Sequence, residues 1–455
     1  MEARPPVRLV VTDDLQRSRL TVGFRLFLAI PHFLWLGLFG MVVFVVVLIS
    51  WFVTLFAGRS PEGFHDLLAK YIRYATRVEA YLFVAANPYP GFLLVNDDPY
   101  PVDVEIDPPA PQRRLVTLFR LFLAFPAILL WLAFSGGSVG AGGGYRIFGG
   151  VAVTAAFLAW FASLARGRCP RGLRDVIVWS LGYSAQVLAY LFLLTDRYPH
   201  TGPDLRGVGP PPLDPDRRLR LLEEIREREP QLTLDEALVR IEGASADVPD
   251  LPARLLVADD LRRSRLTVLF RLLLAFPHIF WILLWTVLAI VVAVLNWFAT
   301  LALGRSPRPF ARFLSAYVRY GTHLSAFLYL VGNPFPGFVG KAGSYPVDLE
   351  LEPFARQHRI VTGFRFLLAF PALLLSSAVG SVAFLTALLG WFVCLVRGRM
   401  PVGLRDAGAY ALGYTAQVSA YVFLLSDRYP YSGPLPFAPA AEPPAAALPA
   451  TVDPV

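Results

Sequence analysis

The phrase FRLFLAIP at 24–31 decides the fold of this chain, because it returns three more times. The other copies are FRLFLAFP at 119–126, FRLLLAFP at 270–277 and FRFLLAFP at 364–371. Each copy opens a long apolar run that closes at a second repeated phrase: GRSP at 58–61, GRCP at 167–170, GRSP at 304–307 and GRMP at 398–401. The chain is therefore a four-fold internal repeat, and the repeat limits the architecture before any other signal is weighed.

The spacing of the two phrases supports this alignment. Arg25 and Arg59 are 34 positions apart, and units 3 and 4 keep that distance, whereas unit 2 carries an insertion. Units 1 and 3 share a leader, Asp13-Asp14-Leu15 in one and Asp259-Asp260-Leu261 in the other. Units 2 and 4 share the ending Asp-Arg-Tyr-Pro, at 196–199 and 427–430. We infer that a pair of units was duplicated whole.

Composition indicates an integral membrane protein. Charged residues make up only 17% of the chain, against about 25% in ordinary soluble domains. The runs 26–57 and 272–303 contain no Asp, Glu, Lys or Arg and exceed the roughly 17–25 residues that span a bilayer. The net charge of +8 comes from arginines that flank these runs, which favours a positive-inside bias over nucleic-acid binding.

The length of each run favours a helical hairpin. A single helix over 26–57 would be about 48 Å long, whereas the hydrocarbon core is about 30 Å thick. Unit 2 inserts a glycine-rich stretch at 135–150, and unit 4 has serines and a glycine at 376–381, although unit 3 shows no such turn signal. We therefore expect about eight membrane helices in four hairpins. The arginine side and both termini would be cytoplasmic, and 136–144 would lie outside.

Each unit also predicts a third helix and a short strand. Charges at 66, 70, 73 and 77 indicate an amphipathic helix in unit 1, whereas 176–194 and 407–425 carry no charge, so a crossing there stays open. Alternating acidic and apolar residues at 102–107 and 347–352 predict half-exposed strands. With the basic leaders at 8–11 and 254–257, they would pair into one small cytoplasmic sheet.

These signals predict an all-α polytopic membrane protein with the following segments. They are repeat unit 1 at 1–97, repeat unit 2 at 98–206, a soluble charged helical linker at 207–250, repeat unit 3 at 251–341, repeat unit 4 at 342–433 and a disordered Pro/Ala-rich tail at 434–455.

The repeated phrases resemble a bacterial membrane family known as domain of unknown function 4389. The resemblance is carried by Tyr100-Pro101-Val102, by LAIPH at 28–32, by GRSPEG at 58–63 and by the Tyr-Pro turn at 198–199. It covers all four units, with departures at Ala127 and Ala372 in place of histidine and at Pro309 in place of glycine. The resemblance implies membrane insertion and supplies no activity, substrate or catalytic residue.

Eight arginines are the main candidate site. They open and close the apolar runs as Arg25 and Arg59, Arg120 and Arg168, Arg271 and Arg305, and Arg365 and Arg399. Such pairs would hold anionic lipid head groups or another anion. The alternative is that they are snorkelling anchors that set topology.

Two histidines and four prolines are further candidates inside the runs. His32 and His278 are ionisable groups at membrane depth, but alanine at the matching places shows that the unit folds without them, which favours a packing role. The prolines Pro31, Pro126, Pro277 and Pro371 should kink their helices, since each removes a backbone donor.

Enzyme motifs are missing from the sequence. It contains no P-loop, no G-x-S-x-G and no metal-ligand spacing, and Cys169 and Cys394 suit small apolar fillers. We therefore expect no catalytic residue, no metal and no cofactor. The favoured function is a non-enzymatic membrane scaffold that binds lipids, or a cytoplasmic protein through 207–250. The alternative is a transporter or channel with a path between the units.

Overall fold

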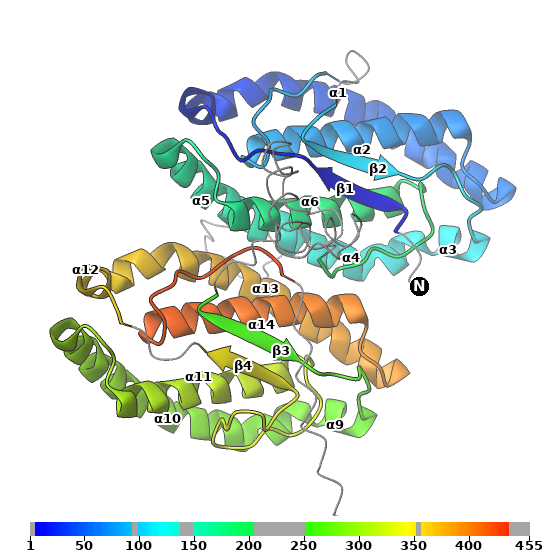
Figure 1. Cartoon of the computed structure of the whole chain (residues 1–455). Helices are drawn as coiled ribbons and strands as arrows, with labels where there is room; N and C mark the ends of the chain where they lie inside the picture. The colour runs from blue at the N-terminus through cyan, green and yellow to red at the C-terminus, as the bar shows by residue number, and fades with distance from the viewer. Residues whose placement is uncertain (1–4, 93–98, 137–148, 204–250, 352–355, 436–455) are drawn as a thin grey trace, which may run out of the picture.

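The computed structural model describes residues 5–92, 99–136, 149–203, 251–351 and 356–435 (Figure 1). The linker at 207–250, most of the unit 2 insertion and nearly all of the C-terminal tail lie outside these ranges. The described residues are mostly helical. Each unit consists of a short strand, a long apolar segment and a helix of 21 residues that packs back against that segment.

The apolar segments are single helices in three of the four units. They are α1 (Arg19–Ala57), α10 (Arg271–Leu303) and α13 (Arg365–Arg397). The hairpins expected in units 1, 3 and 4 are therefore wrong. Gly40 and Gly390 lie inside helices, where an added Cβ would come within 3.3 Å of Tyr71 and 2.7 Å of Met400. These glycines allow close packing and make no turn, because a helix satisfies its own backbone in apolar surroundings.

Unit 2 does have the expected break. Helix α4 (Arg120–Ser135) ends at Gly136, which has a φ of 108°, and α5 (Val151–Arg166) begins after Gly150, with a φ of 79°. Gly136 and Gly149 lie in backbone contact, so no side chain fits between them. The end of α4 and the start of α5 thus lie side by side at these glycines.

Third helices join units 1 and 2 and units 3 and 4, and α13 joins units 2 and 4. The third helices are α2 (Glu62–Leu82), α6 (Arg171–Leu191), α11 (Arg308–Leu328) and α14 (Val402–Val422). α2 contacts α6, α11 contacts α14, and α13 contacts α4 and α5, which gives the spatial order of units 1, 2, 4 and 3 in an open row (Figure 1). The largest core lies between units 2 and 4 and includes Phe134, Trp179, Val379 and Tyr410.

Units 1 and 2 form one half of the protein, and units 3 and 4 form the other. Within each half, the two units are joined by backbone hydrogen bonds. The N–H of Arg17 donates to Gly167 O at 2.9 Å, and the N–H of Gln112 donates to Gly58 O at 2.8 Å. Four tryptophans repeat the exchange by donating to a carbonyl in the other unit of the same half. These contacts are Trp51 to Thr117, Trp160 to Val22, Trp297 to Thr362 and Trp391 to Val268. A half is therefore an interlocked pair, as expected if a pair was duplicated.

The strands form two separate antiparallel pairs. β1 (Val7–Val11) pairs with β2 (Val102–Ile106), and β3 (Ala253–Val257) pairs with β4 (Val347–Leu351). The expectation of basic strands beside acidic ones is confirmed by Arg8 and Glu105, which lie 2.6 Å apart. One sheet of four strands is not formed, because each half pairs its own two strands.

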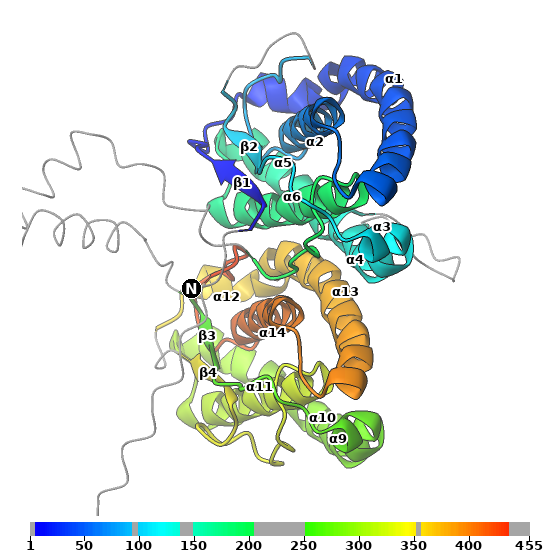
Figure 2. The same ribbon diagram turned by 90° about the vertical axis from the view of Figure 1, so that its right-hand side faces the viewer.

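The four prolines lie inside α1, α4, α10 and α13, as expected. Short helices precede α4, α10 and α13: α3 (Arg114–Leu118), α9 (Arg265–Leu269) and α12 (Arg359–Gly363). Seen along the third helices, α1 curves around α2 and α13 curves around α14 (Figure 2). The long helices therefore present a convex outer side and a concave inner side.

Candidate functional site

The arginines that open the apolar runs are buried. Arg25, Arg120, Arg271 and Arg365 are at most 2% exposed. Arg25 Nη1 donates to the carbonyls of Tyr81 at 2.5 Å and Ala86 at 2.9 Å, just past the end of α2. The other three donate to the matching carbonyls: Arg120 to Tyr190 and Thr195, Arg271 to Phe327 and Gly332, and Arg365 to Ser426.

Each buried guanidinium therefore closes the C-terminal end of a third helix, where the helix dipole favours a cation. The backbone turns sharply there, since Val84, Leu193, Leu330 and Leu424 have φ values of 61–65°. Such a conformation costs a non-glycine residue about 1–3 kcal/mol and persists only where the surroundings enforce it. We infer that these four arginines fix the turn and have no surface open to a lipid head group.

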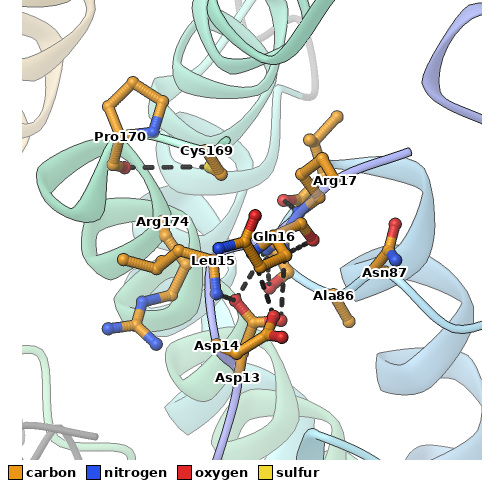
Figure 3. Close-up of polar contacts among 12 residues, drawn as sticks. Asp13, Asp14, Leu15, Gln16, Arg17, Ala86, Asn87, Cys169, Pro170 and Arg174 are labelled. Atoms are coloured by element: carbon orange, nitrogen blue, oxygen red, sulfur yellow. Dashed lines mark hydrogen bonds and ion pairs between the residues drawn. The ribbon is translucent and has the colours of Figure 1, made fainter. Parts of the chain in front are cut away.

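A second buried charge supports the same turn in units 1 and 3. Arg17 forms a two-bond ion pair with Asp13, at 3.0 and 2.7 Å, in the segment drawn in Figure 3. It also donates to the carbonyls of Val84 and Ala85. Arg263 and Asp259 repeat the pair in unit 3. In units 2 and 4 the aligned residues are Gln112 and Gln357, which donate to Leu193 and Leu424.

Sequence reasoning missed four tyrosines that bond at the histidine positions. His32 Nδ1 lies 2.7 Å from Tyr74 Oη, and His278 Nδ1 lies 2.8 Å from Tyr320 Oη. Where alanine replaces histidine, Tyr183 and Tyr414 donate to the carbonyls of Ala127 and Ala372. Both histidines are fully buried and stack on aromatic rings, which suits packing. The constant spacing of these tyrosines from the proline that ends each GR-x-P phrase was the available signal.

The arginines that close the runs have the opposite surroundings. Arg59, Arg168, Arg305 and Arg399 are exposed, and each lies beside exposed arginines at the start of the other unit in its half. These four rim clusters are Arg59 with Arg113 and Arg114, Arg168 with Arg19 and with Arg166 of its own unit, Arg305 with Arg356 and Arg359, and Arg399 with Arg262 and Arg265. The rim clusters, and not the expected sequential pairs, gather the exposed positive charge.

Between the rim clusters lies a large apolar surface. Phe27, Leu34, Phe44 and Phe56 of α1 are 64–73% exposed, and α10 and α13 show the same pattern. By length and composition, α1, α10 and α13 are each long and apolar enough to cross a membrane. Soluble monomers rarely expose contiguous apolar patches larger than a few hundred Å², so this outer side of the long helices, the apolar face, fits contact with lipid.

The opposite side of the third helices carries buried ion pairs with the strands. Asp348 of β4 accepts from His323 Nε2 at 3.0 Å and lies 3.1 Å from Arg319 Nε. Burial alone raises the pKa of the Asp348 carboxyl, but hydrogen bonds from His323 and from the N–H groups of Gly343 and Leu349 outweigh it. The net pKa lies below its usual range.

We expect Asp348→Asn to lower the stability of the native state at pH 7 by about 1.5–3 kcal/mol, the range for a hydrogen bond to a charged group. Because the pKa of Asp348 is lower in the native state than in the unfolded state, the ionised carboxylate stabilises the native state fully above about pH 4. This stabilisation is lost as the pH falls through the native pKa. Unfolding in detergent at pH 7 and pH 3 measures the difference, with the exposed neighbour Glu350→Gln as control. An equal loss at both pH values would contradict this assignment.

Other chemistry receives little support from the described residues. They contain no cluster of three or more His, Cys, Asp or Glu side chains that suits a metal. Cys169 and Cys394 are buried free thiols, and burial raises the pKa of Cys169 to about 11. A small pocket lies beside α14, lined by Arg254, Tyr410, Tyr414 and Tyr431. It opens near β3 and does not run between all four units.

Repeated apolar helices with an exposed apolar outer face and arginine clusters at its rim fit a helical protein that associates with a membrane. The chain belongs to the family described as domain of unknown function (DUF4389), whose model matches residues 19–93, 144–201, 265–339 and 359–433. The four matches coincide with the four units, as the sequence predicted. No curated protein and no solved structure matches the chain.

Proposed function

We propose that this protein is a non-enzymatic scaffold of the bacterial inner membrane that holds anionic lipid head groups at its rim clusters. The observation that carries the proposal is the division of the arginines. One set is buried against backbone carbonyls, whereas the other is exposed at the ends of the apolar helices. Exposed arginines beside an apolar face suit phosphate, because the guanidinium can donate two parallel hydrogen bonds.

The charge balance of the rim clusters supports an anionic ligand. Arg113 lies 3.1 Å from Asp196, but the clusters otherwise bring positive charges together, and arginine side chains there donate to helix-end carbonyls. Each arginine near an anionic membrane surface contributes about 1 kcal/mol. The same proposal includes a cytoplasmic protein partner, which would bind the charged segment 207–250.

A transporter or channel, the alternative, receives less support. The units form an open row and do not surround an axis. The contact between units 2 and 4 is filled by apolar side chains, including Ala127, Leu130, Leu375 and Val379. A hydrated path needs polar groups where these side chains pack. Flux through proteoliposomes containing the protein would favour the alternative.

The test replaces Arg59, Arg168, Arg305 and Arg399 with glutamine. Each rim cluster loses one arginine at about 1 kcal/mol, so we expect the affinity of each cluster for an anionic head group to fall about fivefold. Native mass spectrometry of the protein from nanodiscs containing phosphatidylglycerol measures the retained lipid. A lysine set should keep the charge but retain less lipid than the wild type, since lysine lacks the fork.

The matched control removes four exposed basic residues that lie away from the apolar face. Lys70, Arg254, Arg312 and Lys341 are all exposed, and changing them to glutamine removes the same charge. This control should retain lipid as the wild type does. If the rim variant retained as much lipid as the wild type, the proposal would be overturned. If the control lost as much lipid as the rim variant, the effect would be one of net charge and not of the rim clusters.

A further inference from the structure

In units 1 and 3, the pair formed by the long apolar helix and its third helix has exposed apolar residues on one side and charged residues on the other. We propose that the apolar segments lie in the plane of the membrane within one leaflet, and that none of the described helices crosses the bilayer. The inference rests on the proposed function only in requiring that the apolar face contacts lipid. It replaces the multi-pass arrangement expected from the sequence.

In unit 1, α1 and α2 lie side by side along the whole of α2. Arg25 bonds to Ala86 beyond one end of α2, and His32 bonds to Tyr74 near its middle. Val43 shares a core with Leu68 near the other end. The two axes therefore run together, so any tilt of α1 relative to the membrane also tilts α2.

The other side of α2 is covered by charged strands. Arg77 Nη2 lies 2.6 Å from Asp103 Oδ2, and Arg73 Nε donates to Val104 O at 3.2 Å. The pair of Arg8 and Glu105 continues this polar layer on β1 and β2. Lys70 is exposed in the middle of α2. Charge thus extends along the length of α2, including the middle that lies against α1.

Unit 3 repeats the arrangement. Arg271 donates to Gly332 O at 3.2 Å, and His278 bonds to Tyr320. Thr286 Oγ1 lies 2.8 Å from Tyr317 Oη farther along α11. On the opposite side, Arg319 and Asp348 form an ion pair beneath β4. Two units at the two ends of the row therefore define the same aqueous side (Figure 2).

These contacts decide whether α1 crosses the bilayer or lies in its plane. If α1 crossed the bilayer, α2 would cross beside it, and Lys70 with the pair of Arg8 and Glu105 would reach hydrocarbon depth. Each charge at the bilayer centre costs about 2.5–3.5 kcal/mol on insertion scales. The open edges of a two-stranded sheet would also lose their water. With α1 in the plane, all of these groups stay in water while the apolar face stays in lipid.

The length of the helices supports the same orientation. A helix of 39 residues such as α1 is about 58 Å long, nearly twice the roughly 30 Å thickness of a hydrocarbon core. A helix that lies in the plane of the membrane is not limited by this thickness. The rim clusters then lie at the interface at both ends of every apolar segment, where arginine snorkels. This keeps both ends of each run on one face, as the sequence indicated, without a hairpin.

Site-directed labelling tests the proposal on the full chain after Cys169 and Cys394 are replaced by serine and alanine. Single cysteines are placed at Gln16 and Glu62, which flank α1, and at Met41, which is 64% exposed in the middle of α1. An impermeant thiol reagent is applied to sealed spheroplasts and to inverted vesicles. Leu288, 50% exposed in α10, is a second mid-helix position in case the Met41 variant does not insert.

We expect Gln16 and Glu62 to be labelled from the cytoplasmic side only, and Met41 from neither side. A fluorophore at Met41 should be quenched by lipids that carry a spin label on the acyl chain. Labelling of Gln16 and Glu62 from opposite sides would overturn the inference in favour of a single crossing. Labelling of Met41 from outside would overturn it in favour of a hairpin. Release of the protein by alkaline carbonate would instead overturn the membrane function itself.

Discussion

Replacing Arg25 with glutamine is expected to destabilise the native state by about 3–6 kcal/mol, at about 1.5–3 kcal/mol for each of two buried hydrogen bonds from a charged donor. The change leaves the carbonyls of Tyr81 and Ala86 without their donor at the end of α2. It also removes the guanidinium that lies 4.4 Å from the centre of the Tyr81 ring. The turn at Val84, with its positive φ, then keeps only the hydrogen bonds from Arg17.

The matched control is Arg59→Gln, at the other end of the same apolar run. Arg59 is exposed, and substitutions at such positions change stability by about 0.5 kcal/mol or less. Reversible unfolding of both variants in detergent measures the difference. If Arg25→Gln unfolds like Arg59→Gln, then Arg25 does not hold the turn, and its burial has another cause.

This contrast shows what the sequence was able to predict. Arg25 and Arg59 flank the same apolar run, so their pattern alone gives them one role. The structure separates them because Arg25 meets the end of α2, about 60 positions later in the chain. Local patterns do not report such a contact, which depends on how two helices pack.

The repeat, the third helices and the pairing of basic with acidic strands were predictable because each has a local signature. The continuity of α1 and α13 was not, since glycine and serine signal turns in water but are tolerated inside a helix in apolar surroundings. In α10, where no such signal occurs, the hairpin was predicted from the length of the apolar run alone. The exchange between units, such as Trp51 with Thr117, was also beyond local reasoning. Comparing the four repeats with one another does recover part of it, because the tryptophans and tyrosines recur at fixed spacing.

The repeats also predict how to remove a buried ion pair without unfolding the protein. Arg17 and Asp13 have side-chain exposures of 0% and 2%. Asp13→Ala leaves the Arg17 charge buried without its counterion, and Arg17→Gln does the same to Asp13. Each single change should therefore cost about 3–5 kcal/mol. The exposed neighbour Asp14→Ala, which loses only a bond from the N–H of Gln16, should cost about 1 kcal/mol or less.

The double variant Asp13→Ala/Arg17→Gln should be more stable than either single variant. It reproduces unit 2, where Gln112 replaces the arginine and Pro108 stands in the place of the aspartate. Gln112 Nε2 donates to Leu193 O, and its Oε1 accepts from Arg120 Nη2 at 2.7 Å. In unit 1, Arg25 Nη2 has no hydrogen-bond partner among the described residues, so a glutamine at 17 offers it an acceptor.

Unfolding of the wild type, the two single variants and the double variant gives the interaction free energy as a double-mutant cycle. We expect the coupling to exceed either single loss of about 3–5 kcal/mol, which places it above the usual range for two residues in contact. Strictly additive losses would contradict the equivalence of the two networks. They would mean that Gln112 stabilises its turn only in the surroundings of unit 2, and that the glutamine and the ion pair cannot replace each other at the end of the third helix.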